Sequence, residues 1–320
     1  MQFPHHTWLD PGRILLTDTV LLVHCPQNHM SSKIKSGASK ATTPERRRAA
    51  LLNLLGDENA GVYQAVREQI LVEGGAASEW LKPHALSDDP LLRRRVQEIL
   101  RHVDRQAADN RFLTFCLNHG EEFDLESAAW LLAQTQFPEI NVEAYQALLD
   151  GYANALRERT DHHGRANAML GKISDYLFNE LGFKGNEQNY YEPDNSYLNR
   201  VLDRRTGNPI SLCLFYMLLA RRLRLPIVGI GLPGHFICRH QSASGEIYVD
   251  AFNRGRLLTK ADCVHYLVRG NYDLREEYLA PVSPRRIFLR MCSNLHQIYL
   301  ELGLKDDGTR VQRYLVALAR

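Results

Sequence analysis

The sequence lacks an excess of charge of either sign and a long apolar run. Its 320 residues carry a formal net charge of +2, whereas nucleic-acid-binding domains are usually strongly basic, so we expect no nucleic-acid partner. The apolar segment 14–23 is short and is interrupted by Asp18, which makes it neither a membrane span nor a good secretory signal. We therefore expect no membrane association and a cytoplasmic location.

Patterns typical of metal and cofactor sites are also missing from the sequence. The six cysteines form no CxxC pair, and the cysteines and histidines show no four-ligand zinc spacing. A glycine-rich dinucleotide fingerprint and a phosphate-binding loop are absent as well. We therefore expect no metal and no cofactor, and we expect the cysteines to be free thiols in a reducing compartment.

What the sequence contains divides into four segments. Residues 1–44 end in a stretch rich in Ser, Lys, Gly and Thr, which predicts a flexible N-terminal extension; we expect the folded protein to begin at Met30 or later. Residues 45–120 carry amphipathic helices, and their pairing resembles a HEAT-like repeat or an ordinary helical subdomain. Residues 121–282 are predicted to form the main domain, and residues 283–320 a C-terminal helical hairpin.

A buried helix organises the main domain. Gly207-Asn208-Pro209 is a strong helix start, because Asn208 accepts hydrogen bonds from first-turn amides and Pro209 suits the first helical position. Residues 210–223 are then apolar almost all round until two arginines, which predicts a core helix that is too short to span a membrane. Pro226 ends the pattern, since proline disfavours a helical residue before it.

Three strands are predicted after this helix, at residues 227–232, 235–240 and 246–252. If the turn between the second and third strands centres near residues 242 and 243, His235 lies almost opposite Asp250 on an antiparallel pair. The carboxylate would then hold the imidazole in one tautomer. A register slip of one residue would place the two side chains on opposite faces.

The motifs of this region resemble a known family. The phrases NYYEPDNSYLNRVLDRRTGNPISL, LPGHF and YVDAFN are similar to signature phrases of the bacterial SirB-type branch of the transglutaminase-like superfamily. The resemblance runs roughly from Glu122 to the C-terminus. It implies an α+β fold that is mainly helical, with a small antiparallel sheet packed on a buried central helix, as in the papain-like core. It also implies C-terminal helices similar to a single tetratricopeptide unit.

In this superfamily a Cys on the helix, a His and an Asp form an acyl-transfer triad, and the resemblance assigns the last two roles to His235 and Asp250. The position of the nucleophilic Cys falls near Pro209, which has no nucleophile. The nearest candidates, Ser211 and Cys213, lie about 200° apart around a helix, so they cannot both face one site. Ser211 is closer to the first-turn amides, whereas Cys213 is the better nucleophile but lies among apolar residues. The sequence leaves this choice open.

Residues just before the helix are candidate binding residues. Tyr191 belongs to an aromatic pair that either walls a pocket or simply packs. Asn195, Asn199 and Arg204 precede the buried helix directly, so we expect them to line the site. Asn208, at the start of the helix, is a candidate for the same reason.

Two functional classes follow from these residues. The favoured one is a degenerate transglutaminase-like domain that binds a protein or peptide without turning it over, because the expected Cys is missing. The alternative is an acyl-transfer enzyme or hydrolase acting on amide or ester bonds. In that reading Ser211 or Cys213 attacks, His235 is the general base, Asp250 orients it, and amides near Ile210 and Ser211 hold the oxyanion. The sequence predicts neither a particular partner nor an oligomeric state.

Overall fold

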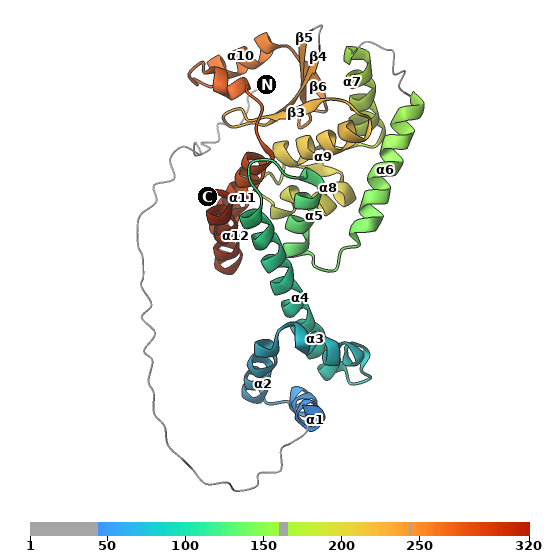
Figure 1. Ribbon diagram of the computed structural model, residues 1–320, viewed down its shortest axis with the longest axis vertical. Helices are drawn as coiled ribbons and strands as arrows, with labels where there is room; N and C mark the ends of the chain where they lie inside the picture. Colours follow the sequence, from blue (N-terminus) through green and yellow to red (C-terminus); the bar gives the residue numbers. More distant parts are fainter. Residues whose placement is uncertain (1–43, 160–165, 243–244) are drawn as a thin grey trace. The chain divides into compact units, whose positions relative to one another are not determined.

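The computed structural model describes residues 44–159, 166–242 and 245–320 of the chain (Figure 1). The predicted N-terminal extension, up to residue 43, lies outside the described residues. The chain divides into two compact units, one ending at Val103 and one running from Asp104 to Arg320. Each unit has an apolar core of its own. The division of the sequence into four segments stays a prediction.

The described part of the first unit is helical. Its elements are α1 (Pro44–Leu55), α2 (Ala60–Glu73), α3 (Gly75–Leu81), the 3₁₀ helix η2 (Lys82–Leu86) and the start of α4 (Pro90–Asn118). Asn59 begins α2 because its side-chain oxygen accepts a hydrogen bond from the Gly61 amide at 2.8 Å. Apolar side chains such as Leu55, Ile70 and Ile99 are fully buried between the helices. Whether these helices form a HEAT-like repeat stays a prediction.

The larger unit begins with helices and short connecting elements. They are the rest of α4, α5 (Leu125–Gln136), α6 (Val142–Arg159), α7 (Ala166–Ser174), the π-helix η3 (Asp175–Glu180), β1 (Lys184–Gly185), η4 (Pro193–Ser196), α8 (Leu198–Arg204) and β2 (Thr206–Gly207). The short strands β1 and β2 pair in parallel. This pairing holds the segment between them as a closed loop just before the central helix.

The central helix α9 (Pro209–Arg222) confirms the predicted core helix. All of its residues from Pro209 to Ala220 are buried, and α9 contacts α5, α6, α8 and α11 as well as strands β3 and β4. Burying each of its large apolar side chains stabilises the fold by about 1.5–3 kcal/mol. No helix within the described ranges is both long and apolar enough to cross a membrane.

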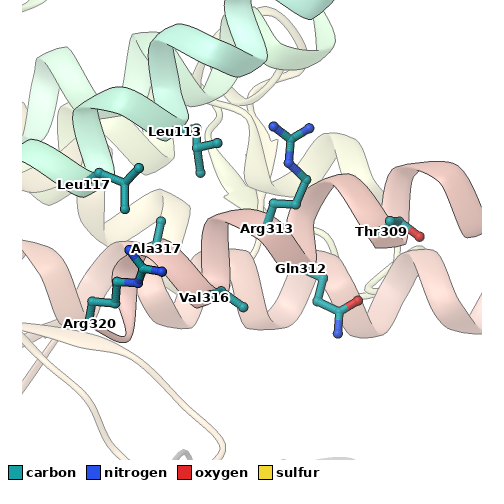
Figure 2. A pocket seen from close by; sticks show the side chains of 8 residues that line it. All are labelled: Leu113, Leu117, Thr309, Gln312, Arg313, Val316, Ala317 and Arg320. Atoms are coloured by element: carbon teal, nitrogen blue, oxygen red, sulfur yellow. The ribbon is translucent and has the colours of Figure 1, made fainter. Parts of the chain in front are cut away.

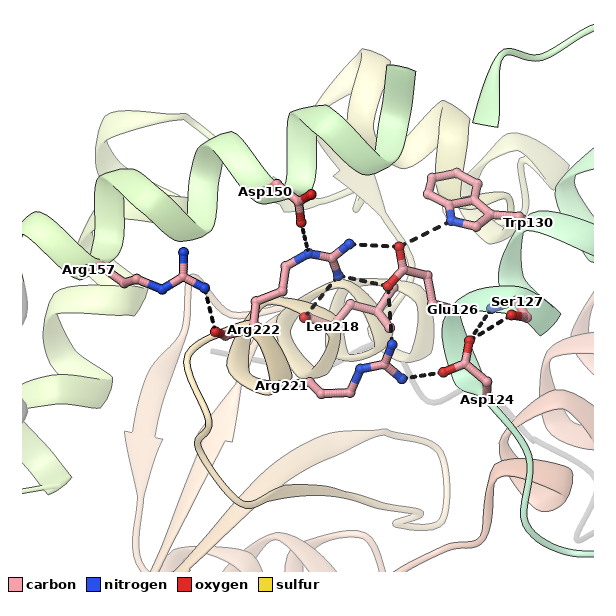
Figure 3. Close-up of polar contacts among 9 residues, drawn as sticks. All are labelled: Asp124, Glu126, Ser127, Trp130, Asp150, Arg157, Leu218, Arg221 and Arg222. Atoms are coloured by element: carbon pink, nitrogen blue, oxygen red, sulfur yellow. Dashed lines mark hydrogen bonds and ion pairs between the residues drawn. The ribbon is translucent and has the colours of Figure 1, made fainter. Parts of the chain in front are cut away.

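Two arginines end α9 and pair with carboxylates from α5, from the residue that caps α5 and from α6 (Figure 3). Arg222 forms hydrogen bonds at 2.8 Å from Nη1 and Nη2 to the two carboxylate oxygens of Glu126, and its Nε donates to Asp150 at 2.6 Å. Arg221 pairs with Asp124. Cations at a helix C-terminus also interact favourably with the helix dipole. This ion-pair network fixes α9 to α5 and α6.

A four-stranded antiparallel sheet follows α9; three of its strands were predicted, and the fourth, β6, was not. Its strands are β3 (Ile227–Ile230), β4 (Ile237–Ser242), β5 (Gly245–Asp250) and β6 (Arg256–Leu258), in that spatial order. The predicted start of the second strand at His235 was wrong by two residues. Gly234 has a φ of 71°, and the His235 amide donates to the Leu232 carbonyl at 3.1 Å, so the chain turns there before it becomes extended.

The unit closes with α10 (Lys260–Arg269), the 3₁₀ helix η5 (Glu276–Leu279), α11 (Pro284–Glu301) and α12 (Lys305–Leu318). The last two pack on each other as a hairpin, which Gly303 makes possible with a φ of 70°. The protein is thus mainly helical with a small antiparallel sheet, which confirms the predicted α+β class. The likeness of the hairpin to a tetratricopeptide unit stays a prediction.

Candidate functional site

The N-terminus of α9 is capped by Asn208, as predicted, and the side chain of Ser211 makes the cap reciprocal, which was not predicted. The Asn208 side-chain oxygen accepts a hydrogen bond from the Ser211 amide at 2.9 Å, and the Asn208 amide donates to Ser211 Oγ at 3.1 Å. Ser211 Oγ also donates to the carbonyl oxygen of Asn195 at 2.6 Å. The hydroxyl of Ser211, a residue only 1% exposed, is therefore part of the backbone scaffold.

His235 and Asp250 meet, as predicted. His235 Nε2 lies 3.0 Å from Asp250 Oδ1, and the two side chains are only 12% and 9% exposed. The predicted register was nevertheless wrong by two residues, because Ser242 pairs with Gly245 across the turn. Two residues is the side-chain period of a strand, so the shift keeps both side chains on the same face.

The carboxylate of this pair is held in its charged form. Burial by itself would raise the pKa of Asp250, but the neighbouring His235 and hydrogen bonds from Asn253 outweigh that effect and lower the pKa below its usual value. Asn253 Nδ2 donates to Oδ2 at 2.7 Å, and the Asn253 amide donates to Oδ1 at 3.2 Å. Asp250 is thereby oriented toward the imidazole.

The turn after Asp250 depends on a glycine. Gly255 has a φ of 67°, and a Cβ atom at this position would lie 2.5 Å from the ring of Phe178 and equally close to Ser174 Oγ. No other residue type fits both the backbone conformation and the space. Gly255 therefore lets the turn that carries Asn253 lie against η3.

The imidazole of His235 and the start of α9 share a small cavity. The cavity has a volume of about 10 Å³, which is roughly the space of one water molecule. Its lining combines the His235 loop, the first turn of α9 and α11, and consists of Tyr190, Pro209, Ile210, Gly234, His235, Phe236, Arg290 and Asn294. Pro209, near which the sequence predicts the position of the superfamily nucleophile, thus lines the same cavity as His235.

Cys213 lies beneath this cavity instead of in its lining. Residues four apart share a helix face, so Cys213 is one turn below Pro209. Its thiol is fully buried and donates a hydrogen bond to the Phe236 carbonyl oxygen at 3.4 Å. Burial raises the pKa of Cys213 well above its usual value, which keeps the sulfur as an unreactive thiol.

Two of the predicted binding residues build the loop before α9. The Asn195 side chain donates to the carbonyl oxygens of Asn189 at 2.8 Å and Tyr190 at 3.1 Å. The Asn208 side chain donates to Ser196 Oγ at 2.9 Å. Both amides are buried and hold the loop that presents Tyr190 to the cavity. Neither Asn195 nor Asn208 lines the cavity itself.

The other three predicted binding residues also lie outside the cavity lining. Arg204 forms a bidentate ion pair with Glu192, at 2.6 and 2.7 Å. Asn199 is 2% exposed, and its Oδ1 has no partner among the described residues. Tyr191 is 38% exposed and packs edge-on against Tyr190. A binding role for these residues stays a prediction.

Arg290 and Asn294 are cavity residues that sequence reasoning missed. Both lie on α11, and Arg290 Nη2 donates to the carbonyl oxygen of His235 at 2.9 Å. The pattern of α11 is that of any amphipathic helix, so nothing local marks these two positions. Among the described residues no group of three or more His, Cys, Asp or Glu side chains is placed to hold a metal ion.

A larger groove lies elsewhere in the same unit, between α4 and α12 (Figure 2). Its volume is about 360 Å³. Its lining is half apolar and half polar, and consists of Leu113, Leu117, Thr309, Gln312, Arg313, Val316, Ala317 and Arg320. None of the sequence-predicted site residues lines this groove.

A His–Asp pair over the N-terminus of a buried helix, beside a small antiparallel sheet, defines a transglutaminase-like core. The family model described as transglutaminase-like superfamily matches residues 143–293. A UPF0162 protein of Xylella fastidiosa is 36% identical over 197 residues, which cover 59% of this chain and 70% of that protein. The chain belongs to the transglutaminase-like superfamily and, within it, to the bacterial SirB-type branch.

Two further relatives match shorter stretches. Protein SirB1 of Salmonella typhimurium is 33% identical over 86 residues, or 27% of this chain and 32% of that protein. F-box only protein 21 of Mus musculus is 38% identical over 146 residues, or 43% of this chain and 22% of that protein. No solved structure matches the chain.

Proposed function

We propose that this protein is a degenerate transglutaminase-like domain that binds a protein or peptide without covalent turnover. The observation that carries the proposal is Pro209. It lies near the position that the family resemblance assigns to the nucleophile, lines the cavity with His235, and has no side-chain atom that can attack a carbonyl carbon.

The two substitute nucleophiles support the same conclusion. Ser211 Oγ donates a hydrogen bond to the Asn195 carbonyl oxygen and accepts one from the Asn208 amide. These hydrogen bonds would have to break before Ser211 could act as the nucleophile. Cys213 is buried below the cavity with a raised pKa. In addition, the Ser211 amide already donates to Asn208, which removes one of the two amides expected to hold an oxyanion.

A second candidate function is acyl transfer or hydrolysis on an amide or ester bond. The 3.0 Å contact between His235 and Asp250 favours it, because a carboxylate that orients an imidazole is the usual support for a general base. Ser211 or Cys213 would add to the carbonyl carbon while His235 accepts the proton, and the proton would then leave with the amine or alcohol.

A labelling experiment tests the proposal. The protein and its His235→Ala variant are treated with a fluorophosphonate probe for serine and a chloroacetamide probe for cysteine, and the sites are mapped by mass spectrometry. We expect no labelling at Ser211 or Cys213 that depends on His235. Labelling of either residue in the parent protein, lost in His235→Ala, would show that the site is an enzyme.

A further inference from the structure

The guanidinium group of Arg290 lies in the cavity lining without a carboxylate beside it. Nη2 donates to the His235 carbonyl oxygen, and the group lies 5.7 Å from the centre of the Phe236 ring. Among the described residues no acidic side chain forms an ion pair with Arg290. Burial lowers the pKa of Arg290, because water is removed without an opposite charge taking its place.

Other buried or half-buried arginines of this unit are satisfied in a different way. Arg222 and Arg310 pair with carboxylates. Arg285 has no carboxylate partner in the part of the chain that the structure describes, but it donates to the carbonyl oxygens of Cys116, His119 and Ala317. A guanidinium group has five N–H donors, and Arg290 uses one of them in a hydrogen bond to a described residue. A half-buried cation with spare donors in a cavity lining indicates a place for an anion.

The cavity presents further donors and no negative charge of its own. Ile210 lines it, and the Ile210 amide has no acceptor among the described residues, whereas the Ser211 and Leu212 amides both donate to Asn208. Such first-turn amides, with the positive end of the helix dipole, favour anions. Asn294 adds a side-chain amide, and none of the eight lining residues is acidic.

The size of the cavity limits the anion. A volume of about 10 Å³ admits a single oxygen-sized group. A carboxylate meets this limit by inserting one oxygen while the rest of the ligand stays outside. Carboxylates are also the anionic groups that an unmodified peptide carries at neutral pH.

We propose that this cavity binds the carboxylate group of a peptide, with Arg290 as its charge partner; this inference rests on the peptide binding proposed above. The carboxylate is that of a C-terminus or of an Asp or Glu side chain. Planar guanidinium groups match the geometry of carboxylates. The cavity thereby selects which end or side chain of the partner is anchored next to His235.

Peptide titrations of the full chain test the proposal. Three N-acetylated peptides of Gly, Ser and Ala are compared by calorimetry: one with a free C-terminal carboxylate, one amidated, and one amidated with a central Glu. We expect the amidated peptide without Glu to bind at least about tenfold more weakly than one of the other two. The stronger of those two identifies the source of the carboxylate. Acetate is expected to displace the bound peptide, and acetamide is not.

Variants of α11 give the matched control. Arg290→Gln is expected to raise the dissociation constant of the carboxylate peptide at least about tenfold, whereas Arg286→Gln, which removes the same charge from an exposed position of the same helix, leaves it nearly unchanged. Arg290→Lys keeps the charge without the fork of donors, and we expect an intermediate affinity. If Arg290→Gln does not fold, Arg290→Lys and the acetate competition decide the question.

The outcomes separate this inference from the proposed function. Equal affinity for free-acid and amidated peptides, no binding of any of the three, or equal effects of the Arg290→Gln and Arg286→Gln variants would overturn the carboxylate site. Cleavage of a peptide during the titration would instead overturn the non-catalytic function. The Arg290→Gln variant would then still report whether the carboxylate is held at this position.

Discussion

Pro209 is the first residue of α9 and shares a cavity with His235. A thiol at this position would lie at the positive end of a helix dipole and near an imidazole, the two features that lower the pKa of reactive cysteines. The imidazole beside this position already contacts a carboxylate, since His235 Nε2 lies 3.0 Å from Asp250 Oδ1. At the residue scale, the side chain at position 209 therefore decides whether this cavity holds a nucleophile beside His235.

The first prediction follows from that difference. Pro209→Cys is expected to create a thiol that reacts with iodoacetamide at least about tenfold faster than the buried Cys213, because its thiolate fraction is larger at neutral pH. The rate is measured by mass spectrometry of the labelled peptide. Pro284→Cys, which places a thiol at the first position of α11, serves as the control. An equal rate after adding His235→Ala would contradict the prediction.

The second prediction concerns the pH dependence of stability. The folded-state pKa of Asp250 is lowered, so its contribution to stability is present above the unfolded-state pKa of about 3.9 and is lost as the pH falls through the folded-state value. As the pH falls below about 4, the free energy of unfolding should decrease more steeply for the parent protein than for Asp250→Asn. Urea denaturation at several pH values measures this, and parallel curves would refute it.

At the scale of elements, α9 was predictable because its signals are local. Asn208 and Pro209 start the helix, and Arg221 and Arg222 end it. The contact between His235 and Asp250 was also predicted, although the position of the turn was not, since residues 242–245 favour more than one turn. The direction of the Ser211 hydroxyl was not predictable, because it depends on the carbonyl of Asn195, which only the folded loop brings near.

A third prediction tests how α9 is held at its C-terminal end. Glu126, whose side chain is 5% exposed, accepts hydrogen bonds from two nitrogens of Arg222 (Figure 3). Glu126→Ala is expected to lower the free energy of unfolding by about 3–5 kcal/mol, because it leaves a largely buried guanidinium with less compensation. Chemical denaturation measures the change. The control is Glu143→Ala on α6, which alters an exposed acidic residue; equal losses in both variants would contradict the argument.

At the scale of the whole molecule, the C-terminal hairpin completes the larger unit. Arg310 of α12 lies 3.4 Å from Asp109 of α4 and donates to the Thr135 carbonyl of α5 at 2.9 Å. Tyr314 donates to the same Asp109 at 2.5 Å. The hairpin also supplies Arg290 to the cavity. This contribution is tertiary, and for that reason the sequence, which showed the hairpin as a separate segment, did not reveal it.

The fourth prediction concerns the contact of α12 with α4. Arg310→Met is expected to cost about 3–5 kcal/mol of stability, because it leaves the buried Asp109 carboxylate without its cation. The double variant Arg310→Met with Asp109→Leu should recover much of the loss, since a buried pair is often replaceable by apolar side chains. Thermal and urea denaturation of the three proteins measure this. A double variant no more stable than the single one would contradict it.

Gly255 touches neither the imidazole nor the guanidinium of the cavity, yet its lack of a side chain allows the turn after Asp250 to close on η3. In a saturation screen scored for partner binding, position 255 should therefore rank with the cavity positions themselves, even for alanine. If Gly255→Ala binds the partner as well as variants at exposed surface positions do, the Asp250 carboxylate keeps its orientation without the close approach of Gly255 to η3. Loss of partner binding in Gly255→Ala would show that this position affects the site only through the backbone conformation of the turn.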